Sequence, residues 1–300
     1  MGTPPTPALR TRGLTKYYGR QTGVLDLDLD VRPGEIFGFL GPNGSGKTTT
    51  IRLLLGLLRP TRGVAEVMGR SVASTGVAAR SLTGYLPGDL ATYERMRGRQ
   101  FLAYLAELRG GVPAGRYEEL AERFRVDLSR RLRELSKGNR QKVGVIQAFM
   151  HRPPLLVLDE PTSGLDPLVQ EEFAQLVRET VSQGSTVFLS SHILSEVEDL
   201  ADRVGILDEG RLLLVDSVDG LRERAPRRIE MDFPATPPEA IGHADGVVSC
   251  RTRGATAYCL VRGGIGPLLK TAVDHGVVDL HTHDPDLEDV FREYTTGARR

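Results

Sequence analysis

The stretch "GPNGSGKTTT", residues 41–50, holds the side chains best suited to chemistry. Glycines lose much backbone freedom on folding, so a cluster of them indicates a tight turn or the close approach of another group. Gly41, Gly46, Lys47 and Thr48 match the pattern G-x-x-x-x-G-K-[ST], whose backbone N–H groups surround a phosphate. Lys47 would neutralise the β and γ phosphates, and the Thr48 hydroxyl would ligate Mg²⁺. We therefore expect a nucleotide to be bound by the whole loop: Gly41, Pro42, Asn43, Gly44, Ser45, Gly46, Lys47, Thr48 and Thr49.

The residues on either side of this loop supply the context that the pattern requires. An apolar run over residues 36–40 predicts a buried strand. Apolar residues at helical spacing follow the loop, and a proline stops them: Ile51, Leu54, Leu55, Leu58 and then Pro60. The glycines therefore lie between a strand and a helix, where the helix N-terminus adds partial positive charge.

A second stretch, "PPLLVLDEPTSGLDP", narrows the class of nucleotide-binding protein. Its aliphatic run Leu155–Leu158 predicts a buried parallel strand that ends in Asp159 and Glu160. Acidic residues at the carboxyl end of such a strand face the crevice where ligands bind. Asp159 is placed to hold Mg²⁺ through water, and Glu160 to polarise an attacking water as a general base. The alternative is an acidic pair at a solvated strand end.

A third stretch, "ELSKGNRQKVGVIQAFM", predicts an amphipathic helix with Ser136 as its N-cap. Ser136 and Gly138 at this helix start make a second anion-binding end. One chain has no use for two such ends on one nucleotide, whereas a dimer could close each on the γ phosphate held by the other subunit. Taken alone, the segment could equally be an ordinary capped helix.

Together these stretches resemble an ATP-binding cassette (ABC) ATPase, the nucleotide-binding subunit of an ABC transporter, over about residues 8–216. Residues 41–49 resemble the Walker A loop, 135–141 the LSGGQ signature, 155–160 Walker B and 163–166 the D-loop. The resemblance implies ATP and Mg²⁺ as ligands, with Asp166 in the nucleotide site. It implies that Tyr18 stacks on adenine, with Tyr17 as the alternative. His192, after "TVFLSS", resembles the switch histidine that contacts the γ phosphate.

Two positions depart from the family pattern. The signature reads LSKGNRQ, with Lys137 and Asn139 as its unusual residues and the phosphate-facing Ser136 and Gly138 kept. In "TGYLPGDLATYE", Gly88 stands where the family has a glutamine that ligates Mg²⁺ and links the site to the membrane partner. Asp89 or a water would take over the metal position, so we expect altered coupling and preserved hydrolysis.

The expected fold is α/β: a P-loop NTPase (RecA-like) core with an antiparallel β flank from residues 8–36 and 61–70. A helical subdomain is inserted over about 92–150, and residues 217–300 form a small α+β accessory domain after the 8–216 cassette. "DPLVQEEFAQLVRETVSQG" predicts a further helix that Asp166 caps, with Pro167 first and Gly184 after its end.

The tail offers weaker signals. "VVSCRTRGATAYCLV" predicts a hairpin that turns near Gly254, with Cys250 and Cys259 roughly facing each other as reduced thiols. "HTHDPDLEDVF" predicts a strand and loop before a C-terminal helix capped by Asp286; the alternative is a metal site, with ligands from His281, His283, Asp284 and Asp286. Its D-P-x-L-E-D-V-F run resembles the C-terminal extension of type-2 ABC exporter ATPases.

Composition sets the expected partners. The 300 residues include 39 basic and 39 acidic side chains, which favour neither nucleic acid nor lipid as a partner. No apolar run approaches a membrane span or signal peptide, so we expect a peripheral protein on the cytoplasmic side of the cell membrane. The expected partners are a membrane-spanning permease in a separate chain and a second, identical cassette that forms a dimer with this one; the alternative is a dimer with a non-identical cassette. The alternative is an ABC ATPase of translation or DNA repair, which would carry two cassettes or long coiled coils.

Overall fold

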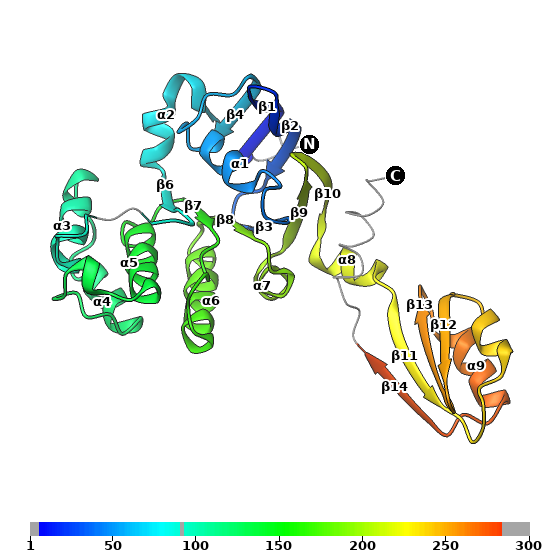
Figure 1. The fold of residues 1–300 in the computed structure, drawn as a ribbon. Coiled ribbons are helices and arrows are strands. Elements are labelled where there is room, and N and C mark those ends of the chain that lie inside the picture. Colours follow the sequence, from blue (N-terminus) through cyan, green and yellow to red (C-terminus); the bar gives the residue numbers. More distant parts are fainter. Residues whose placement is uncertain (1–5, 91–92, 284–300) are drawn as a thin grey trace. The chain divides into compact units, whose positions relative to one another are not determined.

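A computed structural model describes residues 6–90 and 93–283 of the chain. The chain divides into two compact units, Met1–Val215 and Asp216–Arg300 (Figure 1). All the residues expected to handle the nucleotide lie in the first unit.

A six-stranded sheet forms the centre of the first unit, in the order β10-β9-β3-β8-β7-β6. Strands β3, β6, β7, β8 and β9 run parallel to one another. Every residue of β3, β7 and β8 is buried, as expected of parallel strands covered on both faces. The carboxyl ends of β3, β7 and β8 therefore present their following loops at one edge. The strand bounds are Ile36–Leu40 (β3), Thr83–Leu86 (β6), Leu155–Asp159 (β7), Thr186–Ser191 (β8), Arg203–Asp208 (β9) and Arg211–Ser217 (β10).

An antiparallel sheet of four strands, in the order β2-β1-β4-β5, flanks this centre and confirms the expected β flank. Its strands are Leu9–Tyr18 (β1), Gln21–Val31 (β2), Arg62–Val67 (β4) and Arg70–Ser71 (β5). One buried cluster joins the two sheets, with Leu9 and Leu27 from the flank and Phe37 and Phe188 from the centre. This shared core fixes β1 and β2 beside the glycine loop.

Helix α1, Lys47–Leu54, begins inside the glycine loop and is shorter than predicted. The apolar spacing extended the helix toward Pro60, but the chain leaves it at Leu55, and Gly56 follows with φ 65°. A left-handed residue cannot continue a right-handed helix, so Leu58 packs against the core from outside the helix. Helix α2, Val72–Ser81, then precedes β6.

Helices gather beyond β6 as the sequence predicted: α3 (Gly98–Leu108), α4 (Arg116–Arg123), the 3₁₀ turn η1 (Leu132–Glu134) and α5 (Lys137–Phe149) (Figure 1). Helix α6, Pro167–Ser182, follows β7 with Asp166 as its cap, which confirms that prediction. Helix α7, Leu194–Leu200, follows β8. Among the described residues, no helix is both long enough and apolar enough to span a membrane.

The second unit packs helix α9, Gly266–Asp274, onto an antiparallel sheet in the order β12-β13-β11-β14. Its buried core includes Ile229, Met231 and Val261 from the strands and Leu268 and Ala272 from α9. The other elements are α8 (Val218–Arg224), β11 (Arg227–Asp232), η2 (Glu239–His243), β12 (Val247–Arg253), β13 (Thr256–Val261) and β14 (Asp279–His283).

The hairpin predicted around Gly254 is confirmed, with φ 64° at that glycine and Cys250 directly opposite Cys259. Both cysteines are free thiols, and burial raises the pKa of Cys259. His281 and His283 lie on strand β14, and the part of the chain described here holds no metal-binding cluster of His, Cys, Asp or Glu. Asp284, Asp286 and the rest of the D-P-x-L-E-D-V-F run lie outside the described residues.

Candidate active site

The glycine loop takes a path that only glycine permits at three positions. Gly44 and Gly46 have φ angles of 83° and 110°, in the left-handed region that side chains disfavour. A Cβ atom at Gly46 would lie 2.4 Å from the carbonyl oxygen of Gly23, and one at Gly41 would lie 2.2 Å from that of Leu207. The loop is therefore packed against the backbone of two other segments while its N–H groups stay free of Cβ atoms.

Lys47 is nearly buried at the first position of α1, with 5% of its side chain exposed. Its ammonium group donates hydrogen bonds to the carbonyl oxygens of Gly41, at 2.7 Å, and Pro42, at 3.1 Å. Burial lowers the pKa of Lys47, against the opposing effect of Glu160 and Asp159. A cation held inside the loop by weak neutral acceptors can exchange them for a charged one such as phosphate.

Thr48 and Asp159 meet at the carboxyl end of β7. The Thr48 hydroxyl donates to Asp159 Oδ2 at 2.9 Å, and the Ser190 hydroxyl donates to Oδ1 at 2.5 Å. Asp159 is 2% exposed, so its charge is compensated mainly by these donors and by nearby Lys47. A hydroxyl and a carboxylate oxygen are ligands of the kind that Mg²⁺ takes, so this pair fits a magnesium ion.

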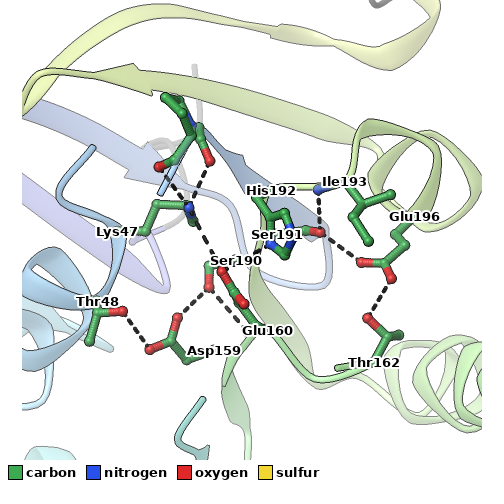
Figure 2. Close-up of polar contacts among 12 residues, drawn as sticks. Lys47, Thr48, Asp159, Glu160, Thr162, Ser190, Ser191, His192, Ile193 and Glu196 are labelled. Carbon is green, nitrogen blue, oxygen red and sulfur yellow. Dashed lines mark hydrogen bonds and ion pairs between the residues drawn. The ribbon is translucent and has the colours of Figure 1, made fainter. Parts of the chain in front are cut away.

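Glu160 and His192 face each other across the ends of β7 and β8 (Figure 2). His192 Nδ1 lies 3.1 Å from Glu160 Oε1, and Lys47 Nζ lies 3.9 Å from the same oxygen. Glu160 has a φ of 48°, an uncommon conformation for a side chain of this size. The structure thus brings a carboxylate, an imidazole and an ammonium group to one point beside the glycine loop.

A cavity of about 390 Å³ lies over the loop. Tyr18 is among its lining residues and Tyr17 is not, because the two side chains of a strand point to opposite faces. Tyr18 is 45% exposed, and the Lys16 ammonium lies 5.5 Å from the centroid of its ring. The remaining lining residues are Gln21, Thr22, Gly23, Asn43, Gly44, Gly46, Lys47, Thr48, Thr49 and Glu160.

Ser136, Gly138 and Asp166 are not among the residues lining this cavity. The Ser136 hydroxyl accepts a hydrogen bond from the Asn139 N–H at 3.2 Å, which confirms Ser136 as the cap of α5. Asp166 caps α6 by accepting from Val169 N–H at 3.1 Å. A Cβ at Gly138 would lie 2.7 Å from the carbonyl oxygen of Gly164, so the helix start packs tightly on the 163–166 stretch. Within one chain, these residues therefore lie outside the cavity over the glycine loop, and Ser136 and Asp166 are exposed.

Gly88 lies beside Asp159. A Cβ placed on it would lie 3.4 Å from the Asp159 carbonyl oxygen and 3.6 Å from the Asp159 carboxylate. Both distances are ordinary contacts, so a side chain would fit at this position and point to Asp159. Asp89 is exposed in the following loop.

Sequence reasoning assigned no contact to four residues that hold the two strand ends in place: Gln141, Thr162, Ser191 and Glu196. Gln141 donates its side-chain amide to the carbonyl oxygen of Pro161 at 3.0 Å. Thr162 and Ser191 both donate to the carboxylate of Glu196, at 2.6 and 2.7 Å. These residues belong to four different segments, and no spacing pattern connects them; the only local signal is the serine pair before His192.

Comparisons with known proteins show which family the chain belongs to. The family model of ABC transporters, ABC_tran, matches residues 24–163. The bacitracin transport ATP-binding protein BcrA of Bacillus licheniformis is 33% identical over 97% of this chain and 98% of its own. The Nod factor export ATP-binding protein I of Cupriavidus metallidurans is 32% identical over 98% of this chain and 99% of its own. The daunorubicin/doxorubicin resistance ATP-binding protein DrrA of Streptomyces peucetius is 38% identical over 71% of this chain and 66% of its own.

Two solved structures share the fold. The ATP-binding subunit of an ABC transporter has a TM-score of 0.65 at 33% identity and covers 72% of this chain and 92% of its own. A dimeric ATP-binding cassette bound to ADP and Pi has a TM-score of 0.64 at 20% identity, over 70% of this chain and 98% of its own. These likenesses confirm the P-loop NTPase fold expected from the sequence.

The fold and the site therefore define a P-loop ATPase of the ATP-binding cassette class, and the chain belongs to the ABC transporter family. It is an ATP-binding subunit of that family, with ATP hydrolysis as its activity. The named relatives serve transport and drug resistance, which does not favour the alternative of translation or DNA repair.

Proposed function

We propose that the chain is the energy-coupling subunit of an exporter and hydrolyses ATP with Mg²⁺ at the glycine loop. One observation carries this proposal: Glu160 Oε1 lies 3.1 Å from His192 Nδ1 and 3.9 Å from Lys47 Nζ, at the mouth of the loop. Glu160 is the general base that accepts the proton of the attacking water. His192 contacts the γ phosphate and reports its loss.

The other residues bind and orient the nucleotide. Lys47 leaves its two carbonyl acceptors and pairs with the β and γ phosphates, which are stronger, charged acceptors. Thr48 and Asp159 hold Mg²⁺, which neutralises phosphate charge when it is bound. The Tyr18 ring, on the cavity wall, stacks on the adenine.

Removal of the Lys47 charge tests the proposed role of the glycine loop in binding ATP. Replacing Lys47 by alanine should lower ATP turnover by about 100-fold or more, because it removes a donor aimed at the transferred phosphate. Lys270→Ala, an exposed lysine on α9, is the matched control and should retain full turnover. Chelation of Mg²⁺ should stop hydrolysis in both proteins. Turnover that persists in Lys47→Ala would exclude this site as the ATPase centre.

We also propose that two cassettes pair head to tail, with the Ser136 helix start of each closing on the γ phosphate in the other. Ser136 and Lys137 are exposed at the start of α5, outside the cavity of their own chain. The dimeric cassette among the fold neighbours supports a pairing of this kind. Asp166 takes part from the adjacent stretch, where Gly164 packs on Gly138.

Light scattering on the Glu160→Gln protein tests the pairing, since it would bind ATP without consuming it. With ATP and Mg²⁺ this protein should have the mass of a dimer, and adding Ser136→Arg should return it to a monomer by crowding the phosphate. Ser182→Arg, at the far end of α6, is the control and should leave the dimer intact. A monomer with ATP in both cases would contradict pairing between identical chains and point to a second, different cassette.

The membrane part of the proposal rests on what the relatives are named for: bacitracin transport, Nod factor export and drug resistance. We propose that a permease in a separate chain carries the exported molecule, with this subunit on the cytoplasmic side of the membrane. Co-purification of the tagged chain with the product of a neighbouring reading frame tests this. A membrane protein of about six spans is expected there; ribosomes or DNA as the co-purifying material would favour the alternative.

A further inference from the structure

Glu196, in the first turn of α7, connects the two loops that carry the proposed catalytic pair (Figure 2). One carboxylate oxygen accepts from the Thr162 hydroxyl at 2.6 Å, and the other accepts from the Ser191 hydroxyl at 2.7 Å. Thr162 is 7% exposed and Ser191 is 2% exposed, so both donors are buried, whereas Glu196 is half-buried. Hydrogen bonds from hydroxyls to a carboxylate at such distances are strong ones.

Thr162 and Ser191, which the Glu196 carboxylate bridges, each lie next to a residue of the proposed catalytic pair. Thr162 follows Glu160 by two residues, at the end of β7, and Ser191 immediately precedes His192, at the end of β8. The Ser191 oxygen also accepts the backbone N–H of Ile193 at 2.9 Å, so both residues that flank His192 are held. A rigid carboxylate with one oxygen on each loop fixes the distance between the loops.

Glu160 needs such support because its backbone is strained. A left-handed φ in a non-glycine residue costs about 1–2 kcal/mol and persists only where the surroundings impose it. The Glu160 N–H donates to the Ser190 carbonyl at 3.1 Å, and the Gln141 amide holds the Pro161 carbonyl at 3.0 Å. The hydrogen bond from Thr162 to Glu196 is a third contact that holds the chain just after Glu160.

We propose that Glu196 is a positioning residue for ATP hydrolysis, which acts by keeping Glu160 and His192 in register across β7 and β8. The proposal rests on the roles proposed above for those two residues. It assigns Glu196 no contact with the nucleotide, because its two carboxylate oxygens accept hydrogen bonds from Thr162 and Ser191. Loss of the bridge would let the Glu160–His192 pair drift, and an error of about 1 Å in such a pair can cost about 100-fold in rate.

The competing explanation is that Glu196 merely stabilises the start of α7 through its negative charge. A charge effect of that kind would change the free energy of unfolding without changing kcat. Asp199, an exposed acidic residue in the last turn of the same helix, controls for the loss of a carboxylate from α7 away from the two loops. A positioning role would lower kcat while leaving the KM for ATP near its original value, because phosphate and adenine contacts stay intact.

The test measures ATP turnover and urea denaturation of the full chain for Glu196→Ala, Glu196→Gln and the control Asp199→Ala. We expect Glu196→Ala to lower kcat by about 10- to 100-fold with an unchanged KM. Glu196→Gln should recover most of that loss, since its amide can still join the two hydroxyls. Asp199→Ala should keep the original kcat. Unchanged kcat in a folded Glu196→Ala protein would overturn the proposal, as would an equal loss in Asp199→Ala.

A double-mutant cycle separates this proposal from the proposed function itself. If Glu196 acts through the Glu160–His192 pair, adding Glu196→Ala to His192→Ala should lower kcat much less than it does in the original chain. Fully multiplicative losses would overturn the positioning role while leaving the proposed roles of Glu160 and His192 intact. Full turnover in His192→Ala, by contrast, would overturn the proposed function of that histidine.

Two further variants keep the test decisive if Glu196→Ala does not fold. Thr162→Val and Ser191→Ala each remove one hydroxyl and leave the carboxylate on its other partner. Each should lower kcat with little change in KM, and the two together should resemble Glu196→Ala. Original kcat in both single variants and in the pair would overturn the proposal.

Discussion

Glu160 combines a backbone that is unfavourable for its residue type with a side chain in contact range of two charged or ionisable partners. Its φ of 48° turns the chain sharply after β7 and aims the carboxylate at Lys47 and His192. Contacts with Ser190 and Gln141 from neighbouring segments hold this conformation, together with a local hydrogen bond from the Ser163 N–H to the Glu160 carbonyl oxygen at 3.2 Å. Single residues of this kind cannot be read from sequence spacing, because their conformation is imposed by tertiary contacts.

Two glycines of the loop, Gly44 and Gly46, should differ in how much stability is lost when each is replaced by alanine. Gly44→Ala meets open space, so its cost is the left-handed φ alone, about 1–2 kcal/mol of unfolding free energy. Gly46→Ala has the same kind of strain, and its Cβ also clashes with the Gly23 carbonyl oxygen at 2.4 Å. Urea denaturation should therefore show the larger loss for Gly46→Ala; equal losses would contradict the packing described for the loop.

We expect the free energy of unfolding to depend on pH through His151. Burial, aided by the charge of Arg109, lowers its pKa to about 4 from the ordinary 6.5. Both ring nitrogens are buried. Weak contacts with the backbone of Thr83 and Gln147 raise the pKa of His151 and oppose the effect of burial only in part. The folded state thus holds the neutral ring, and the unfolded state binds the extra proton. Protonation of the unfolded state therefore lowers the free energy of unfolding as the pH falls from 6.5 toward 4, by about 3 kcal/mol at most.

Denaturation at pH 7 and pH 4.5 measures this contribution. His151→Leu should reduce the fall in unfolding free energy between the two pH values, because the variant has no imidazole to charge. His243→Leu, an exposed residue of the second unit, should retain the original fall. An undiminished pH dependence in His151→Leu would rule out His151 as its source.

At the scale of elements, Arg123 ties α4 to α6. Its guanidinium pairs with both oxygens of Glu179, at 2.6 and 2.9 Å, and also with Glu172. These carboxylates hold the pKa of Arg123 above its usual value, and Arg123 lowers the pKa of Glu179. A bidentate pair in a network contributes more than an isolated surface pair. The contact fixes the helical arm against a helix of the central layer.

We expect Arg123→Ala to lower the unfolding free energy by about 1–2 kcal/mol, a figure reduced for the half-exposed partners. The control is Arg99→Ala, whose pair with Glu118 joins α3 to α4 and is 60% exposed at the arginine. That change should cost less than about 0.5 kcal/mol. The difference between the two variants should shrink in high salt; a larger loss for Arg99→Ala would contradict this assignment.

Much of this element-level architecture could be predicted because its signals are local. The β7 strand, the glycine loop and the caps Ser136 and Asp166 are each written within a few residues. The end of α1 was predicted wrongly. The apolar spacing extended the helix to Leu58, whereas the chain leaves the helix before Gly56, which has a left-handed φ. The Glu196 bridge joins segments about 30 residues apart and depends on how β7 and β8 pair, which no short pattern encodes.

At the scale of the whole molecule, the first unit contains every residue placed at the proposed ATP site, and Gly88 lies beside Asp159 in that unit. The contacts a Cβ would make at Gly88 support the alignment of "YLPGD" with the position that is glutamine in the family. We propose that this chain transmits nucleotide binding to its partner without a side chain at that point.

Gly88→Gln tests this in the assembled transporter. The new amide would reach toward Asp159 from a position with room for it, so hydrolysis in the isolated chain should change by less than about twofold. Stimulation of hydrolysis by the permease should rise, because the amide can touch both partners. Asp89→Ala should leave hydrolysis unchanged if water fills the metal position. Equal stimulation before and after Gly88→Gln would mean that Gly88 has no part in coupling.

The central claim is that one carboxylate, Glu160, separates ATP binding from ATP hydrolysis in this chain. The most direct measurement is the identity of the nucleotide held by purified Glu160→Gln after incubation with ATP and Mg²⁺, beside Glu223→Gln as an exposed control on α8. We predict intact ATP in the first protein, with turnover reduced by about 100-fold or more, and ADP in the control. Formation of ADP by Glu160→Gln at the original rate would contradict the account.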